Sequence, residues 1–174
     1  MNDTQKNEPM IIVSACLAGL RTVNYPSFAN EDAAVQQLVA DGRALPVCAE
    51  QLGGLPTPRP PAGFLGGKAD AFWAGSSRVI TRVVSTEGDD YSEAFLGGCH
   101  EVLRLAQLTG AVQAILSDGS PTCGVSRTSY YDASGDLVHG PGCGALTWLL
   151  REHGIEVYSP ASWREAFGDG HLQT

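Results

Sequence analysis

The sequence lacks a long hydrophobic segment and has few basic side chains. No apolar run approaches the roughly 18 residues that span a bilayer, and the opening segment MNDTQKNEPM has no apolar core of the kind found in signal peptides. Eleven Lys and Arg residues stand against 19 Asp and Glu residues, which gives a net charge of −8. An acidic chain does not favour nucleic acid or an anionic membrane as a partner. We therefore expect a cytoplasmic protein that binds a small or neutral molecule, with no nucleic-acid or membrane partner.

The sequence also lacks closely spaced cysteine pairs. It has five cysteines, an odd number, and long and irregular intervals separate them. A disulfide framework is therefore not expected, and in a reducing compartment the thiols should be free. Free thiols bind metals, act as nucleophiles or simply fill a core.

Short apolar runs alternate with segments of helical periodicity along most of the chain. The expected strands are 10–15, 44–47, 70–73, 78–84, 111–116 and 155–158. Strands 70–73 and 78–84 are expected to pair as a hairpin, and 128–139 is expected to be another. The expected helices are 30–41, 143–152, 161–167 and a long helix that Asp89 or Asp90 caps and that runs through Leu108. Such alternation favours a parallel sheet. We predict a single α/β domain over 10–174, a layered sandwich with a mostly parallel, Rossmann-like sheet and helices on both faces, preceded by a disordered tail at 1–9.

Proline positions refine this prediction. Pro46 places its strand at the edge of the sheet or near the strand's end, because proline cannot donate to a central ladder. Ser159, followed by Pro160, is expected to begin the last helix. The proline-rich segment 53–61 is expected to be a stiff loop over the core rather than a ligand for a proline-binding domain.

Three of the five cysteines follow the C-terminal ends of expected strands. They are Cys16 after 10–15, Cys48 after 44–47 and Cys123 after 111–116. In an open parallel sheet these ends share one edge, where ligands usually bind. We therefore expect three thiols to meet at one site. Cys99 and Cys143 are expected on helices, as small buried side chains.

The turn that carries Cys123 has the sequence SDGSPTCGV at 117–125. Asp118 and Ser120 can hydrogen-bond to nearby backbone groups, and Gly119 accepts a positive φ. The turn should therefore hold the Cys123 thiol in a defined position.

Residue chemistry alone leaves the role of these thiols open. A structural zinc site usually has four protein ligands and often a CxxC motif, whereas an iron–sulfur cluster tolerates widely separated thiolates and can leave one iron without a protein ligand. A nucleophilic cysteine needs a nearby base. The histidines are His100, His139, His153 and His171. Only His100 adjoins a cysteine, and neighbours on a helix point in different directions, so we rank a cysteine hydrolase below a metal cluster.

Four segments resemble, in order and spacing, the thiouracil desulfidase-like family, long described as a family of unknown function. They are SACLAG at 14–19, LPVCAEQLGGLPTPRPP at 45–61, RVIT at 78–81 and SPTCG at 120–124. The resemblance spans nearly the whole chain. Segment 20–26 departs from the family's wording, and Ser117 stands where a lysine is frequent.

This resemblance implies a [4Fe-4S] cluster with three cysteine ligands, Cys16, Cys48 and Cys123. It also implies a small-molecule partner, a thiolated nucleobase whose sulfur approaches the fourth iron. The expected activity converts thiouracil, or a related thioamide, to uracil and hydrosulfide. The cluster would act as a Lewis acid, without net electron transfer.

The resemblance further implies roles for four other side chains. Glu50 and Ser120 occupy positions that serve proton transfer in the family, and Ser14 and Thr122 are expected to line the substrate pocket. From the residues alone, Glu50 would instead be a first-turn helix carboxylate and Ser120 a turn-forming hydroxyl.

Two alternatives from other classes stay open. A chain of the same fold could bind a cluster or a small molecule without catalysis, or it could hold zinc as a structural module. An activity assay distinguishes the first alternative from an enzyme, and metal analysis distinguishes the second.

Overall fold

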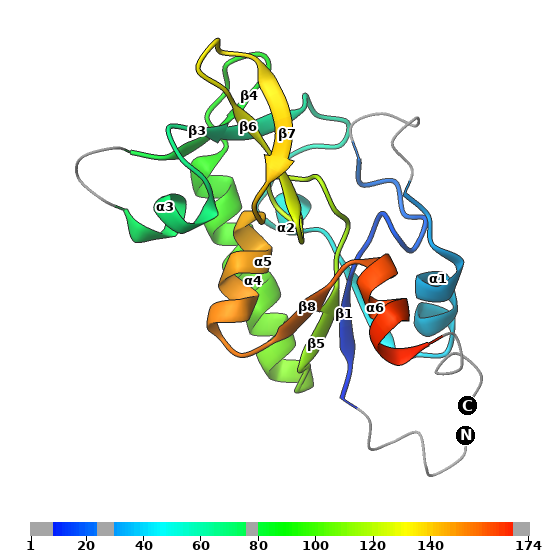
Figure 1. Cartoon of the computed structure of the whole chain (residues 1–174). Helices are drawn as coiled ribbons and strands as arrows, with labels where there is room; N and C mark the ends of the chain where they lie inside the picture. Colours follow the sequence, from blue (N-terminus) through cyan, green and yellow to red (C-terminus); the bar gives the residue numbers. More distant parts are fainter. Residues whose placement is uncertain (1–8, 24–29, 76–79, 169–174) are drawn as a thin grey trace.

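The computed structural model describes residues 9–23, 30–75 and 80–168 (Figure 1). Its strands are β1 (Ile11–Ser14), β2 (Ala44–Val47), β3 (Ala62–Leu65), β4 (Arg82–Ser85), β5 (Gln113–Ile115), β6 (Arg127–Tyr131), β7 (Leu137–Pro141) and β8 (Glu156–Tyr158). Its helices are α1 (Ala33–Ala40), α2 (Ala49–Leu52), α3 (Ala69–Ala74), α4 (Ser92–Thr109), α5 (Ala145–Glu152) and α6 (Pro160–Phe167). Residues 1–8 of the tail expected at 1–9 lie outside the described ranges. None of the described helices is both long and apolar enough to cross a membrane.

Sheet A, in the order β2-β1-β5-β8, is the parallel sheet that the sequence predicts. Successive residues of a strand face opposite sides of a sheet. Ile11 and Val13 pack with Leu38 of α1, whereas Ile12 belongs to the cluster that contains residues of α4 and α5. Helices α1 and α6 therefore cover one face, and α4 and α5 cover the other (Figure 1). The predicted α/β fold, with a parallel sheet and helices on both faces, is confirmed.

Sheet B, in the order β4-β3-β6-β7, is a second layer that the sequence did not indicate. β3 pairs antiparallel with β4, β6 pairs antiparallel with β7, and β3 joins β6 in parallel. The hairpin expected over 128–139 is confirmed, because β6 and β7 flank a turn in which the Asp132 carboxylate accepts the Ser134 N–H at 2.8 Å. Sheet B lies beyond the C-terminal ends of the sheet A strands, at the top of Figure 1.

Two predictions between β2 and α4 are wrong. Segment 70–73, expected to be a strand, belongs to helix α3, which buries Ala69 and Phe72 three residues apart and ends at Gly75. A helix of six residues is too short to show a clear period, and its aromatic residues resemble those of a strand. The expected hairpin between 70–73 and 78–84 is therefore absent, and β4 pairs with β3 instead. Residues 78 and 79 lie outside the described part.

Some of the helix ends agree with those predicted from the sequence, and others do not. Ser159 caps α6 with its hydroxyl, and Pro160 is the first helical residue, as expected. Helix α4 is capped by Tyr91, one or two residues later than the expected Asp90 or Asp89. Asp90 accepts the Ser92 N–H at 2.9 Å from outside the cap position. Cys143 lies in the loop before α5 and not in the helix expected at 143–152.

Strand β2 lies at an edge of sheet A, which is one of the two positions that Pro46 predicts. Its inner neighbour is β1, where Val13 is the register partner of Pro46. The cysteine that follows β2 therefore lies at one side of the sheet's C-terminal end.

Helix α2 lies directly against α4 because each presents a glycine at the contact. A Cβ atom on Gly98 would lie 1.8 Å from the carbonyl oxygen of Ala49, and one on Gly53 would lie 1.9 Å from that of Ala94. No side chain fits at these distances, so only glycine permits the approach. The contact fixes the depth of α2, the helix that carries Glu50.

Candidate active site

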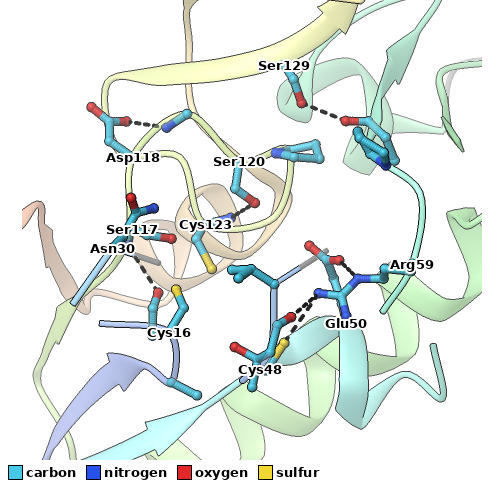
Figure 2. A pocket seen from close by; sticks show the side chains of 18 of the residues that line it. Cys16, Asn30, Cys48, Glu50, Arg59, Ser117, Asp118, Ser120, Cys123 and Ser129 are labelled. Atoms are coloured by element: carbon cyan, nitrogen blue, oxygen red, sulfur yellow. Dashed lines mark hydrogen bonds and ion pairs between the residues drawn. The ribbon is translucent and has the colours of Figure 1, made fainter. Parts of the chain in front are cut away.

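Three loops at the C-terminal edge of sheet A converge on one cavity (Figure 2). Cys16 lies in the turn after β1, Cys48 follows β2 directly, and Cys123 lies in the loop after β5. All three line a cavity of about 250 Å³. The other two cysteines do not line it: Cys99 is buried in α4, and Cys143 packs against the core before α5. The structure thus brings together the three thiols that follow sheet A strands.

These thiols are free; Cys16 is buried, and Cys48 and Cys123 are half-buried. Burial raises the pKa of the Cys16 and Cys123 thiols, and neighbouring thiols raise it further. A buried thiol stays neutral unless a positive charge lies nearby, and a bound metal supplies such a charge. Among the described residues, no three Cys, His, Asp or Glu side chains surround the position of a single ion. Three thiols spread around a cavity instead fit a multi-iron cluster, in which different cysteines bind different irons.

Asp118 organises the turn that carries Cys123. One carboxylate oxygen accepts the backbone N–H groups of Val125, Ser126 and Arg127 at 2.8, 3.0 and 2.9 Å. The other oxygen accepts the Ser126 hydroxyl at 2.6 Å. Partial burial alone would raise the pKa of Asp118, but the hydrogen bonds from Ser126 and the backbone outweigh it and lower this pKa to about 2. The turn is therefore held from within by an ionised carboxylate.

Ser120 forms the turn expected of it and also lines the cavity. Its hydroxyl oxygen accepts the backbone N–H of Thr122 at 3.0 Å and that of Cys123 at 3.3 Å. Gly119, directly before it, has the expected positive φ, at 85°. Since the oxygen is occupied as an acceptor, the hydroxyl hydrogen is the part of Ser120 that can turn toward a ligand.

Glu50 lies in the first turn of α2 and lines the cavity. Arg59 Nε donates to one carboxylate oxygen, and the Thr122 hydroxyl donates to the other. Figure 2 shows Glu50 and Arg59 joined beside Cys48. A first-turn position alone does not require these partners, which come from two other segments. The carboxylate therefore links the end of β2 to the turn that carries Cys123.

Arg59 is a site residue that the sequence did not reveal. It belongs to the proline-rich segment 53–61, yet its side chain is only 4% exposed and lines the cavity. Arginine is seldom so buried unless its donors are paired. One arginine among prolines shows no period and no recognisable spacing, so nothing in the sequence indicated that this side chain turns inward.

Ser14 and Thr122, both expected to line the pocket, lie at different depths. Ser14 lines the cavity, and its hydroxyl accepts the backbone N–H of Ser117 at 3.0 Å. Thr122 is 1% exposed and is not among the cavity-lining residues; its hydroxyl is directed at Glu50. Ser14 can therefore touch a ligand directly, whereas Thr122 acts on the cavity through Glu50.

Sheet B closes the cavity on the side away from the cysteines (Figure 2). Ser129 of β6 and Leu137 and His139 of β7 line it. The sequence did not place His139 near a thiol, and within the described ranges no hydrogen bond joins it to one. His100 and His153 bond to carbonyl groups of their own helices, and His171 lies outside the described part. None of the described histidines is therefore paired with a cysteine as its base.

A family model described as 2-thiouracil desulfurase matches residues 11–161. The chain belongs to the 2-thiouracil desulfurase family. The resemblance seen in the four sequence segments is thus confirmed. The matched region of this desulfurase family includes all three cavity cysteines as well as Glu50 and Ser120.

Two relatives show how far the similarity extends beyond the desulfurase family's sequence pattern. An uncharacterized protein, YbbK, from Bacillus subtilis (strain 168) is 33% identical over 150 residues, which cover 86% of this chain and 95% of that protein. A solved structure of the [4Fe-4S]-dependent thiouracil desulfidase TudS is 36% identical, with a TM-score of 0.72, over 91% of this chain and 95% of the other. Sequence similarity therefore extends over nearly the full length of both relatives, and the fold is shared with TudS over nearly its full length.

Proposed function

We propose that this protein is a desulfidase that removes sulfur from a thiolated pyrimidine, or a related thioamide, with a [4Fe-4S] cluster held by Cys16, Cys48 and Cys123. One observation carries the proposal: three free cysteines from three parallel strands line a cavity that also contains Glu50 and Ser120. The iron–sulfur dependence and the thiouracil substrate named for the relative TudS support it.

The proposed reaction replaces a thiocarbonyl sulfur with oxygen from water. Thiouracil and water give uracil, hydrosulfide and a proton. A carbon–oxygen double bond replaces the carbon–sulfur double bond, and no net oxidation or reduction takes place. When bound, the cluster supplies a Lewis-acidic iron without a protein ligand, which polarises the thiocarbonyl. The protein's own side chains must then move the protons of the attacking water.

Glu50 is placed to carry these protons. Its carboxylate reaches the cavity wall and is held in one orientation by Arg59 and Thr122. It takes a proton from the attacking water and returns it to a ring nitrogen or to the departing sulfur. Ser120 directs its hydroxyl hydrogen at the substrate while its oxygen stays bonded to the turn. Ser14 contacts the substrate from the sheet A side.

Metal content tests the cofactor. Anaerobic reconstitution with iron and sulfide should give about four irons per chain and a broad visible absorption. Changing Cys16, Cys48 and Cys123 together to Ser should abolish iron binding. Cys99→Ala is the matched control, because Cys99 lies in the core of α4 and away from the cavity. Zinc as the sole stoichiometric metal, or normal loading of the triple variant, would overturn the cluster.

Product analysis tests the activity. The loaded protein should release hydrosulfide and uracil in equal amounts from 2-thiouracil or 4-thiouracil without any added oxidant or reductant. A protein that binds the cluster but releases hydrosulfide from neither compound would overturn either thiouracil as the substrate or the assignment as an enzyme.

A further inference from the structure

The guanidinium group of Arg59 connects three segments of the chain around the cavity. It has five N–H donors, and the structure supplies five acceptors. They are the Glu50 carboxylate for Nε, the Pro56 carbonyl and the Thr57 hydroxyl for Nη1 (both 3.2 Å), and the Thr22 carbonyl (2.8 Å) and Cys48 Sγ (3.8 Å) for Nη2. A buried arginine with every donor bonded is fixed in position by its surroundings.

Two of these contacts belong to groups with different tasks in the proposed reaction. Through Nε the guanidinium holds the carboxylate of Glu50, and through Nη2 it reaches the sulfur of Cys48. Because the guanidinium is planar and rigid, the two contacts cannot vary independently. A lysine ammonium is a point charge on a flexible stem and cannot hold both partners at a set separation.

We propose that Arg59 is a positioning residue that holds the carboxylate of Glu50 in a fixed relation to the metal-binding sulfur of Cys48. The proposal rests on the function proposed above, since it assigns a metal to Cys48 and proton transfer to Glu50. Its effect on turnover comes through geometry, because a displacement of about 1 Å in a reacting group can cost on the order of 10²-fold in rate. Its effect on the cluster comes through the N–H bond to the sulfur, since hydrogen bonds to ligand sulfurs tune iron–sulfur centres.

Arg59→Lys tests the first effect, with Arg82→Lys as the matched control. Arg82 pairs with Asp90 at an exposed position and does not line the cavity, so this change should leave kcat within about twofold of wild type. Arg59→Lys should retain its iron and lower kcat by roughly 10- to 100-fold with little change in KM.

A double-mutant comparison then separates positioning from a general structural role. If Arg59 acts through Glu50, Arg59→Lys should have almost no further effect on kcat in a Glu50→Gln background, because both changes remove the same function. An equal loss in both backgrounds would show that Arg59 does not act through Glu50.

The second effect is measured without turnover. The reduction potential of the bound cluster should fall in Arg59→Lys, because a hydrogen bond to a ligand sulfur is lost, and should stay unchanged in Arg82→Lys. An unchanged potential in Arg59→Lys would overturn the contact with Cys48. This measurement remains decisive when wild type shows no desulfidase activity, whereas a wild type that binds no cluster overturns both proposals.

If Arg59→Lys does not fold, NMR of the Arg59 side chain in the protein that retains this residue tests the same contacts. The ¹⁵N-labelled Nε–H of Arg59 should exchange slowly with water, shift in Glu50→Gln and broaden when the cluster is loaded. A signal that responds to neither change would overturn the proposal.

Discussion

The two sheets contribute to the cavity in different ways. The segments that follow the strands of sheet A supply its three sulfurs and its carboxylates, Glu50 and Asp118. Sheet B supplies only Ala62, Ser129, Leu137 and His139 among the described lining residues, so it adds neither a sulfur nor a carboxylate. The reactive groups therefore come from segments that follow sheet A, and the residues that cover the cavity come from sheet B. Changes near sheet A should alter the chemistry, and changes in sheet B should alter substrate binding.

Glu50→Gln tests the reactive layer and should have the largest effect. Glutamine keeps the shape of the side chain but cannot take up a proton, so hydrosulfide release should fall by roughly 10²–10⁴-fold. Iron content and the cluster's absorption should not change. Rates are compared at equal cluster loading, and a variant as fast as wild type would remove Glu50 from the proton path.

Gly98→Ala tests the close contact between α2 and α4 that fixes the position of the helix carrying Glu50. A methyl group 1.8 Å from the Ala49 carbonyl oxygen must push α2 away from α4, which should lower the free energy of unfolding by about 2–3 kcal/mol. Gly97→Ala is the control on the same helix, since nothing lies within 4 Å of its added methyl group; it should raise stability by up to about 1 kcal/mol. Urea unfolding of the cluster-free protein measures both. Equal stability of the two variants would mean that the helices do not touch as described.

Ser120→Ala should slow turnover less than Glu50→Gln, because a water molecule can replace the hydroxyl at the cavity. It should also loosen the turn, since two backbone N–H groups lose their acceptor. The same hydrosulfide assay, run beside thermal unfolding, measures both effects. A larger loss of rate than in Glu50→Gln would reverse the assigned importance of the two residues.

Leu137→Ala tests the role of sheet B, which covers the cavity. The variant should raise KM for the thiolated base by about 10-fold, because apolar contact with the substrate is lost, while iron content and kcat stay close to wild type. Val138→Ala, on the same strand but outside the cavity lining, is the control and should not change KM. Loss of iron in Leu137→Ala would contradict the assignment of cluster binding to sheet A and substrate binding to sheet B.

Asp118→Asn should have the smallest effect, and the effect should depend on pH. The folded-state pKa of Asp118 is about 2, below the usual value near 4. Its carboxylate therefore stabilises the fold fully above about pH 4 and loses that contribution as the pH falls toward 2. Because the group is largely exposed, solvent screening limits the contribution to about 1 kcal/mol. Unfolding free energies at pH 7 and pH 2.5 should show the wild-type advantage shrinking, and a constant advantage would contradict the assignment.

Sheet A was predictable because its strands leave a local signal. Segments such as 10–15 are short continuous apolar runs, which is the pattern of parallel strands buried on both faces. Sheet B left a local signal only in part: its β6–β7 hairpin and most of β4 lie in segments expected to be extended, whereas β3 and its pairing with β6 were not expected. Strand β3 has four residues, of which Phe64 is fully buried, and it pairs with β6, more than sixty positions later in the chain. Its existence depends on contacts between distant segments rather than on its own composition.

The candidate site divides in the same way. Cys16 and Cys48 directly follow strands, so the edge that they share could be inferred from chain order. Arg59 could not be found in this way, because its burial depends on partners such as the Thr22 carbonyl, 37 residues away. The inward position of Thr122 likewise depends on Glu50, 72 residues away. Local patterns located the sulfurs, whereas the groups that orient the carboxylate became visible only in three dimensions.

The edge position of Pro46 restricts how copies of this protein can meet. Ile11 and Ala15 of the neighbouring segment donate to the carbonyl groups of Arg43 and Val47, so in this alternating pattern the backbone of Pro46 points away from sheet A. Proline has no N–H, and an incoming strand would find no donor at that point. Strand-by-strand pairing of one molecule with the next is therefore disfavoured at β2.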